Sequence, residues 1–377
     1  MTVPMYLNMR IPDPLVRLVI DYNTDALKPI YQGDAEFAFK MTIPNIVANG
    51  TMSARFIEYG HGLFGSYNEI TSGYLRTQSD TYGYIIGGVN LIGMCYEDVL
   101  SIVDIIGYNT TNFEMIPDRL HQGMLNELFL VKLFKSTNFQ NDKNIFEFNG
   151  NMVQFNNGYN YYGNSQGGIM GVVHMALTKD VTHGVLGVPG GPYELLLFRS
   201  KDFTIFEDMI KIRYPNDIER VLFISLVEIL WLRLEPLGYV SHIINNPLPN
   251  TPIHNVLFHF SLGDAQVTWL GAEQLGRSLH CYMFNSQISE YNETLYGFNF
   301  VNDNFTINTN NPNDNGKCAI QGWNYNAPQV PFVNRPPNDG VDTHERTRKQ
   351  LNAQKANNIF FTQGIIYNAC DGPCNGQ

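Results

Sequence analysis

The sequence predicts an α/β protein whose central sheet is mostly parallel and flanked by helices on both faces. Strand-like runs alternate with helix-like runs along most of the 377 residues, an order typical of such sheets. The strand-like runs are almost wholly apolar, as expected for strands buried on both faces. Only residues 193–250, which carry two helix-like runs, interrupt the alternation. We therefore expect a core formed by residues 1–192 and 251–377, with residues 193–250 inserted as a helical cap.

The expected strands are apolar or alternating runs that end at turn residues such as Gly, Asn and Pro. In chain order they are residues 36–45, 52–60, 82–94, 157–163, 183–191, 254–264 and 317–325, of which 82–94 is a buried strand followed by a loop.

The expected helices have apolar residues at helical spacing. Leu120, Met124, Leu128 and Val131, for example, share one face of a helix over 117–134, and Asp118 lies in its first turn. In chain order the helices are residues 68–80, 117–134, the segment after Ser165, 193–212, 216–234, 267–280 and 344–361.

Charge and hydropathy exclude two classes of partner. The net charge is −11 and charged residues make up 16% of the chain, so it lacks the basic face that a nucleic-acid-binding protein needs. No run reaches the 18 apolar residues of a transmembrane helix, and we expect no stable membrane insertion. The first residues lack the basic and apolar regions of a signal peptide. The protein is thus either cytoplasmic or an exported protein whose leader has been removed.

A serine between closely spaced glycines is the main candidate for chemistry. Ser165 stands in Gly163-Asn164-Ser165-Gln166-Gly167, after a strand and before a helix. The G-x-S-x-G pattern has meaning only in this strand–turn–helix context, where the turn holds the serine hydroxyl exposed. The turn brings its flanking backbones so close that side chains at positions 163 and 167 would clash. We expect Ser165 to be a nucleophile; the alternative is an incidental serine in a glycine-rich turn.

A nucleophilic serine needs two hydrogen-bond donors for the oxyanion that forms when it attacks a carbonyl. One is the amide of the residue after the nucleophile, Gln166, at a helix N-terminus that favours negative charge. The second comes from a loop after an earlier strand, and Tyr59–Gly65 (YGHGLFG) ends such a strand. We assign the second donor to the Leu63 amide, with Phe64 as the alternative.

The base and the acid should follow the serine in the order Ser, Asp or Glu, His. Of the nine histidines, His344 lies on a late polar turn before the last expected helix. Asp264 follows the end of a strand, where its carboxylate could orient the imidazole. The alternatives for the acid lie close to His344 in the sequence, where hydrogen bonds to the turn explain them better. They are Asp339, Asp342 and Glu345. Cys95 is a rival nucleophile, but it has no elbow of its own.

Five segments together carry a family resemblance: YGHGLFG (59–65), GMCYED (93–98), YYGNSQGGI (161–169), GDAQVT (263–268) and THERTR with CDGPC (343–348 and 370–374). From about residue 30 onward the chain resembles a poorly characterised group of bacterial and protist serine hydrolases with the α/β-hydrolase fold. The resemblance implies Ser165, Asp264 and His344 as a catalytic triad, and export or lipid anchoring in many members. Ala265 departs from the pattern, because similar sequences often carry histidine there.

The cysteines and the sequons bear on the compartment. Cys370 and Cys374 flank the turn formers Asp-Gly-Pro and are expected to form a disulfide. A zinc site would need a second pair of ligands, so we expect no metal. Together with the resemblance, this bond favours a secreted or extracytoplasmic protein. Four Asn-x-Ser/Thr sequons point weakly the same way. They begin at Asn49, Asn109, Asn292 and Asn304.

The sequence therefore predicts a serine hydrolase that cleaves carboxylic esters through an acyl-enzyme, without a cofactor. The expected substrate is a small-molecule or lipid-like ester. Aromatic residues of the expected cap would either line a site for an apolar group or pack the cap onto the core. They are Tyr193, Phe198, Phe203, Phe206 and Trp231. A peptidase or amidase with the same triad, and a catalytically idle binding protein on the same fold, are the alternatives.

Overall fold

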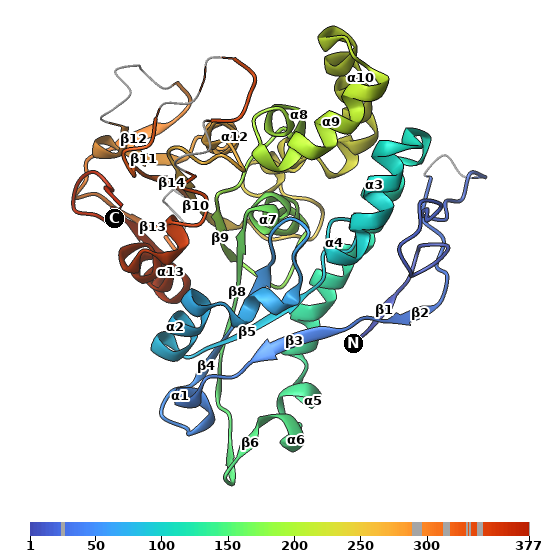
Figure 1. Cartoon of the computed structure of the whole chain (residues 1–377). Helices are drawn as coiled ribbons and strands as arrows, with labels where there is room; N and C mark the ends of the chain where they lie inside the picture. The colour runs from blue at the N-terminus through green and yellow to red at the C-terminus, as the bar shows by residue number, and fades with distance from the viewer. Residues whose placement is uncertain are drawn as a thin grey trace.

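The computed structural model describes residues 1–23, 27–288, 296–311, 317–328, 331, 333–337 and 342–376. Within them, nine strands form one sheet, and eight of these strands are parallel (Figure 1). The ninth strand of this sheet, β3, lies at one edge and pairs antiparallel with β5. In sheet order the strands are β12 (Asn299–Val301), β11 (Tyr282–Phe284), β14 (Cys318–Trp323), β10 (Asn255–Ser261), β9 (His183–Gly187), β8 (Phe155–Asn164), β4 (Ala54–Gly60), β5 (Tyr84–Val89) and β3 (Phe39–Thr42).

Helices cover both faces of this sheet. Side chains of β4 alternate between the faces: Phe56 packs with α4 and α7, and Ile57 packs with α2 and α13. The helices are α1 (Asn45–Ala48), α2 (Gly73–Tyr82), α3 (Val99–Gly107), α4 (Met115–Lys135), α5 (Thr137–Gln140), α6 (Lys143–Phe146), α7 (Gln166–Leu177), α8 (Tyr193–Leu197), α9 (Thr204–Arg213), α10 (Asp217–Trp231), α11 (Pro236–Tyr239), α12 (Trp269–Ser278) and α13 (Leu351–Gln363).

Three short ribbons complete the described strands. They are β1 (Thr2–Pro4) with β2 (Asp34–Glu36), β6 (Glu147–Phe148) with β7 (Asn151–Met152), and β13 (Thr306–Asn308) with β15 (Ile365–Tyr367).

Local sequence explains where several helices begin and end. The Asn216 side chain accepts a hydrogen bond from the Ile218 amide and caps α10. Gly83 and Gly364 end α2 and α13 in the left-handed conformation, with φ of 71° and 66°, which glycine adopts at no steric cost. Asparagine before a helix and glycine after it are thus signals that mark helix ends in a sequence.

The chain between β9 and β10 is helical, as the pattern over residues 193–250 predicts. Helices α8, α9 and α10 group together beyond the carboxyl end of β8 (Figure 1). Tyr193, Leu196 and Trp231 of this segment pack into a core cluster with residues of α4 and α7. Ligands of parallel α/β sheets bind outside the carboxyl ends of the strands, so these helices lie at the edge where a site is expected.

The run over 82–94 is a strand followed by a loop, as expected, and the strand ends at Val89. Two helix boundaries differ from the expectation. The run over 193–212 forms two helices, Tyr193–Leu197 and Thr204–Arg213. The closing helix expected over 344–361 begins at Leu351, after a 3-10 turn at Thr347–Lys349. The Thr343 hydroxyl donates to the Leu262 carbonyl at 2.8 Å. This long-range contact holds the start of the segment in a loop, so that His344 precedes the helix instead of opening it.

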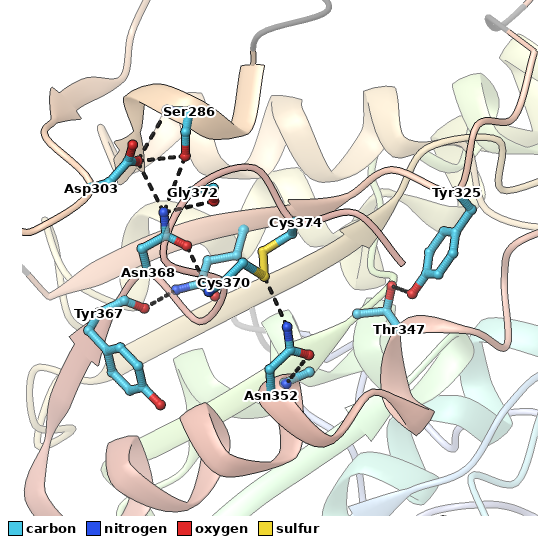
Figure 2. The surroundings of a disulfide bond; sticks show 12 residues. Ser286, Asp303, Tyr325, Thr347, Asn352, Tyr367, Asn368, Cys370, Gly372 and Cys374 are labelled. Atoms are coloured by element: carbon cyan, nitrogen blue, oxygen red, sulfur yellow. Dashed lines mark hydrogen bonds between the residues drawn. A yellow bond between two sulfur atoms is a disulfide. The ribbon is translucent and has the colours of Figure 1, made fainter. Parts of the chain in front are cut away.

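The expected bond between Cys370 and Cys374 is present. Figure 2 shows its surroundings: the Asn352 side chain of α13 donates to Cys370 Sγ, and the Asn368 side chain bonds to Asp303 and Ser286. The loop thus joins the tail to the last helix and to the segment between β11 and β13.

A second disulfide, between Cys281 and Cys318, was not predicted. Strands β11 and β14 are parallel neighbours, with Tyr282 opposite Ala319. This register places the preceding residues, which are the two cysteines, opposite each other. The pairing needs the sheet register, which the sequence pattern alone does not give.

Candidate active site

Ser165 occupies a sharp turn between β8 and α7. Its φ and ψ are 59° and −123°, a region that a residue other than glycine rarely adopts and that is strained. The Ser165 amide donates to the Gly187 carbonyl of β9 at 3.0 Å, and its carbonyl accepts from the Ile169 amide at 2.8 Å. These bonds hold the turn, so the strand–turn–helix context that gives the motif its meaning is present.

The two glycines of the motif are required sterically. A Cβ atom at Gly163 would lie 2.1 Å from the Gly167 oxygen. A Cβ atom at Gly167 would lie 2.0 Å from the oxygen of Gly60, the last residue of β4. Each distance is far inside van der Waals contact, because β8, α7 and β4 meet at this turn. The reason predicted for the glycines from the motif therefore holds in the structure.

Asp264 and His344 are brought together from positions 80 residues apart. His344 Nδ1 lies 2.7 Å from Asp264 Oδ2, and the two residues are 2% and 1% exposed. The other carboxylate oxygen of Asp264 accepts the amides of Gln266 at 2.9 Å and Val267 at 2.8 Å. The carboxylate is thereby fixed at the end of β10, where it can orient the imidazole ring.

The described rivals for the acid have other partners. Asp342 accepts hydrogen bonds from the amides of Ala265 and His344 and pairs with Lys201. Although burial raises the pKa of Asp342, these bonds and that from Gln266 lower it to about 2. Glu345 pairs with Arg348 at 3.0 Å. Asp339 lies outside the described residues.

Ser165 and His344 line the same cavity. No hydrogen bond joins their side chains among the residues that the structure describes. In free enzymes such bonds are often long and tighten only when substrate binds. The structure therefore places the three predicted triad residues at one site and pairs two of them directly.

Two backbone amides near Ser165 are suited to bind an oxyanion. Gln166 is the first residue of α7, where the N–H has no acceptor within the helix. In the loop after β4, the Phe64 amide donates to the Met94 carbonyl at 3.0 Å, so it is already used. No hydrogen bond of the Leu63 amide is found within the described part of the chain. Of the two alternatives that the sequence left open, Leu63 is thus the available donor.

Two side chains, the buried His61 and the half-buried Glu69, hold this loop, and the sequence pattern gave neither a role. His61 Nε2 accepts the Leu91 amide at 2.9 Å, so the ring proton sits on Nδ1, which donates to the Gly62 oxygen at 2.7 Å. Burial lowers the pKa of His61 to about 4 and keeps the ring neutral. The Glu69 carboxylate accepts the Gly62 amide at 3.1 Å. A histidine directly before the glycine of such a loop is the signal that could have indicated this support.

Two cavities of different character meet at Ser165. The larger one has a volume of about 1580 Å³ and carries charged side chains, including Lys201, Arg335 and Glu345. The smaller one has a volume of about 140 Å³ and an almost wholly apolar lining from the core and from α8–α10. Residues common to both linings are Leu63, Phe64, Ser165, Asp202, Phe206 and Gln266. A bound molecule could therefore extend into both cavities from the serine.

The rival nucleophile Cys95 is poorly suited to attack a substrate. Cys95 is fully buried and its thiol lies 3.1 Å from Asp98 Oδ2. Burial and the nearby carboxylate raise the pKa of Cys95 well above its usual range, so the thiol stays protonated and a poor nucleophile. Among the described residues, no group of three or more His, Cys, Asp or Glu side chains is arranged to hold a metal ion. Among the helices that the structure describes, none combines the length and the apolar composition of a membrane-spanning segment.

Comparisons with known proteins show likeness only to solved structures. No family model matches the chain, and no curated protein matches it. Acetyl xylan esterase 1 from Thermoanaerobacterium is 12% identical with a TM-score of 0.44, over 80% of this chain and 74% of that one. An esterase from Pyrococcus furiosus is 14% identical with a TM-score of 0.36, over 64% of this chain and 78% of that one.

The chain spans a third of a longer structural neighbour. An acylaminoacyl peptidase from Pyrococcus horikoshii is 13% identical with a TM-score of 0.37, over 66% of this chain and 33% of that one. Independently of these scores, the chain has a mostly parallel sheet with an antiparallel strand at one edge and a strained serine turn between β8 and α7. The chain has the α/β-hydrolase fold.

Proposed function

We propose that the protein is a serine hydrolase that cleaves carboxylic esters through an acyl-enzyme. The observation that carries this proposal is the conjunction at one cavity of a strained Ser165 and of His344 bonded to the buried Asp264. A histidine held by a carboxylate can remove the serine proton and stabilise the charge that it acquires.

The chemistry follows from the atoms that face the cavity. His344 Nε2 takes the proton of Ser165 Oγ as the oxygen attacks the ester carbonyl. The amides of Leu63 and Gln166 bind the oxyanion, which such donors stabilise by about 3–4 kcal/mol each. His344 then gives its proton to the leaving alcohol, and water repeats the sequence on the acyl-enzyme. Besides the ester and this water, the steps use only groups of the protein.

The helices of residues 193–250 have a part in this proposal as a cap over the site. Four of the five aromatic residues that the sequence analysis singled out line the small cavity: Tyr193, Phe203, Phe206 and Trp231. Tyr193 and Trp231 also pack in a core cluster. For these two side chains, lining a site and packing the helices onto the core, which the sequence analysis left as alternatives, therefore go together. The cap thereby gives the site its apolar wall.

A serine-reactive fluorophosphonate and p-nitrophenyl acetate test the proposal. Wild-type protein should take up one label on Ser165 and hydrolyse the ester, and Ser165→Ala should do neither while remaining folded. A panel of matched anilides tests for amidase activity. Turnover by Ser165→Ala near the wild-type rate would refute the nucleophile, and wild-type protein that neither labels nor turns over any ester would be an idle binding protein.

We also propose that the protein works in an oxidising compartment. Two disulfides support this, since the cytosol keeps such thiols reduced. The three sequons whose asparagines are described, at Asn49, Asn109 and Asn304, are exposed; Asn292 lies outside the described residues.

A further inference from the structure

We propose that the ester joins a short apolar acyl group, no larger than about a benzoyl or hexanoyl group, to a bulky polar alcohol. The inference rests on the proposed hydrolase function and adds the substrate class. It follows from the two cavities that meet at Ser165 and from the position of the base, His344, which lines only the larger one.

The position of His344 decides which cavity takes which half of the ester. His344 lines the large cavity and is absent from the lining of the small one. The leaving alcohol must lie next to the imidazole that protonates it, so the alcohol occupies the large cavity. The carbonyl carbon sits at Ser165, and the acyl chain continues in the other direction, past Gln166 and into the small cavity.

The volume of the small cavity limits the acyl group. Its 140 Å³ is close to that of an engineered apolar cavity of about 150 Å³ that stays dry and binds benzene. Its lining includes the buried aliphatic side chains of Ile102, Leu196 and Ile224. A chain of twelve carbons exceeds this space, so the cavity argues against long-chain lipids.

One ionisable side chain in this wall is kept neutral. Glu228 lines the small cavity. Burial, together with the neighbouring Glu235 carboxylate, raises the pKa of Glu228 to about 8. At pH 7 the Glu228 carboxyl group is therefore mostly protonated and presents no full charge to an apolar acyl group. The other carboxyl group of the lining, that of Asp202, is shared with the large cavity and so lies where the two cavities meet.

The large cavity suits a polar alcohol. Charged side chains of both signs line it, among them Lys201, Glu345 and Arg335. Mixed charges bind hydroxyl and amide groups through hydrogen bonds without demanding a net charge on the ligand. With more than ten times the volume of the small cavity, it admits a leaving group larger than the acyl group.

Two ester series test the inference on the whole protein. With p-nitrophenyl esters, kcat/KM should rise from acetate to hexanoate, by up to about fourfold for each methylene buried, and fall at dodecanoate. Methyl hexanoate should be cleaved faster than hexyl acetate, which carries the six-carbon chain on the alcohol side. A profile that still rises at dodecanoate, or a preference for hexyl acetate, would overturn the assignment.

A variant that fills the small cavity locates the acyl group. Val227 lines it from α10, and Leu226, its neighbour, is 55% exposed and lines neither cavity. Val227→Phe should lower kcat/KM for hexanoate by about tenfold relative to acetate, and Leu226→Phe should leave the ratio unchanged. Equal ratios in both variants would refute the inference.

A second variant guards against misfolding of the first. Phe203→Leu enlarges the small cavity and should shift the optimum toward octanoate; an unchanged optimum would refute the inference. Fluorophosphonate labelling is run on every variant. A wild-type protein that neither takes up the label nor hydrolyses any ester would refute the proposed hydrolase function. An active wild-type enzyme with a different chain-length profile would refute only the proposed substrate class.

Discussion

At the residue scale, the proposed acid and its nearest rival differ in their partners. Asp264 bonds to the His344 ring, and Asp342 bonds to the His344 backbone and to Lys201. Asp264→Asn should lower kcat by about 10⁴, because an amide there favours the wrong imidazole tautomer. Asp342→Asn should change kcat far less. Steady-state kinetics of both variants checks the ranking, and the reverse order would move the acid to the loop before His344.

Much of the candidate site could be predicted residue by residue, because its chemistry dictates residue types in a fixed chain order. Ser165, Asp264 and His344 lie at strand ends or on a loop, where the pattern placed them. His61 and Glu69 escaped prediction because their roles depend on contacts with backbone amides, namely those of Leu91 and Gly62. Such contacts leave no periodic pattern of apolar residues in the sequence.

At the scale of elements, the nucleophile turn depends on how closely α7 approaches β4. Gly167→Ala should cost about 1–3 kcal/mol of unfolding free energy, since its Cβ atom would meet the Gly60 oxygen. It should also lower kcat more than tenfold by separating the Gln166 and Leu63 amides. Urea unfolding and ester hydrolysis measure the two effects.

A matched control for that substitution is Gly73→Ala. Gly73 is the first residue of α2, and an added Cβ atom there meets nothing within 4 Å. This variant should keep wild-type stability within about 0.5 kcal/mol and full activity. If Gly167→Ala behaves in the same way, the close approach does not constrain the turn.

Behind the turn, a buried charged cluster connects three elements. His174 of α7 lies 3.1 Å from Glu58 of β4 and 3.5 Å from Glu127 of α4, and all three residues are 0–1% exposed. Burial alone would lower the pKa of His174, but the two carboxylates outweigh it and raise that pKa to about 10. Burial also raises the pKa of Glu58 to about 7. The cluster ties α7, which follows Ser165, to α4 and to β4, which precedes the loop of Leu63.

The raised pKa of His174 fixes the sign of a pH effect. A folded state that binds the proton more tightly gains stability that is complete below pH 6.5 and is lost as pH rises toward 10. The stability advantage of wild type over the Glu58→Gln/His174→Gln double variant should therefore shrink by at least about 1.4 kcal/mol over that range.

The control for this effect is His121→Gln. Burial lowers the pKa of His121 to about 4, so in the folded protein this group is neutral between pH 6.5 and 10. In the unfolded chain, where its pKa is about 6.5, it loses its remaining proton by about pH 7.5. The stability difference of His121→Gln from wild type should therefore change by no more than about 0.4 kcal/mol near pH 6.5 and stay flat from about pH 7.5 to 10, when unfolding is followed by urea titration at each pH. A flat difference for the double variant as well would show that His174 is neutral in the folded protein.

Long elements were predicted better than short ones. Helix α4 and strands β4, β8 and β10 carry enough residues for a period to show. Strands β11 and β12 have three residues each, and each exists because a neighbouring strand provides an edge: β14 for β11, and β11 for β12. Pairing partners of this kind are a property of the fold, so a local pattern does not contain them.

At the scale of the whole molecule, two disulfides lie in the part of the chain that follows residues 193–250. The Cys281–Cys318 bond joins β11 to β14 and spans 37 residues of sequence, whereas the Cys370–Cys374 bond spans 4. A cross-link removes more entropy from the unfolded chain when its loop is longer. On this basis the two bonds stabilise by about 4 and about 2 kcal/mol.

Separate removal of each bond tests this order. The Cys281→Ala/Cys318→Ala variant should lose about 4 kcal/mol of unfolding free energy, and the Cys370→Ala/Cys374→Ala variant about 2 kcal/mol or less. The fully buried Cys95 serves as the internal reference, since alkylation under native conditions should spare it and alkylation after unfolding should modify it alone.

Mass spectrometry of unreduced protein from its native source then addresses the compartment. If four further cysteines take up the alkylating agent there, the bonds do not form in the cell, and the proposal of an oxidising compartment fails while the hydrolase chemistry at Ser165 stands.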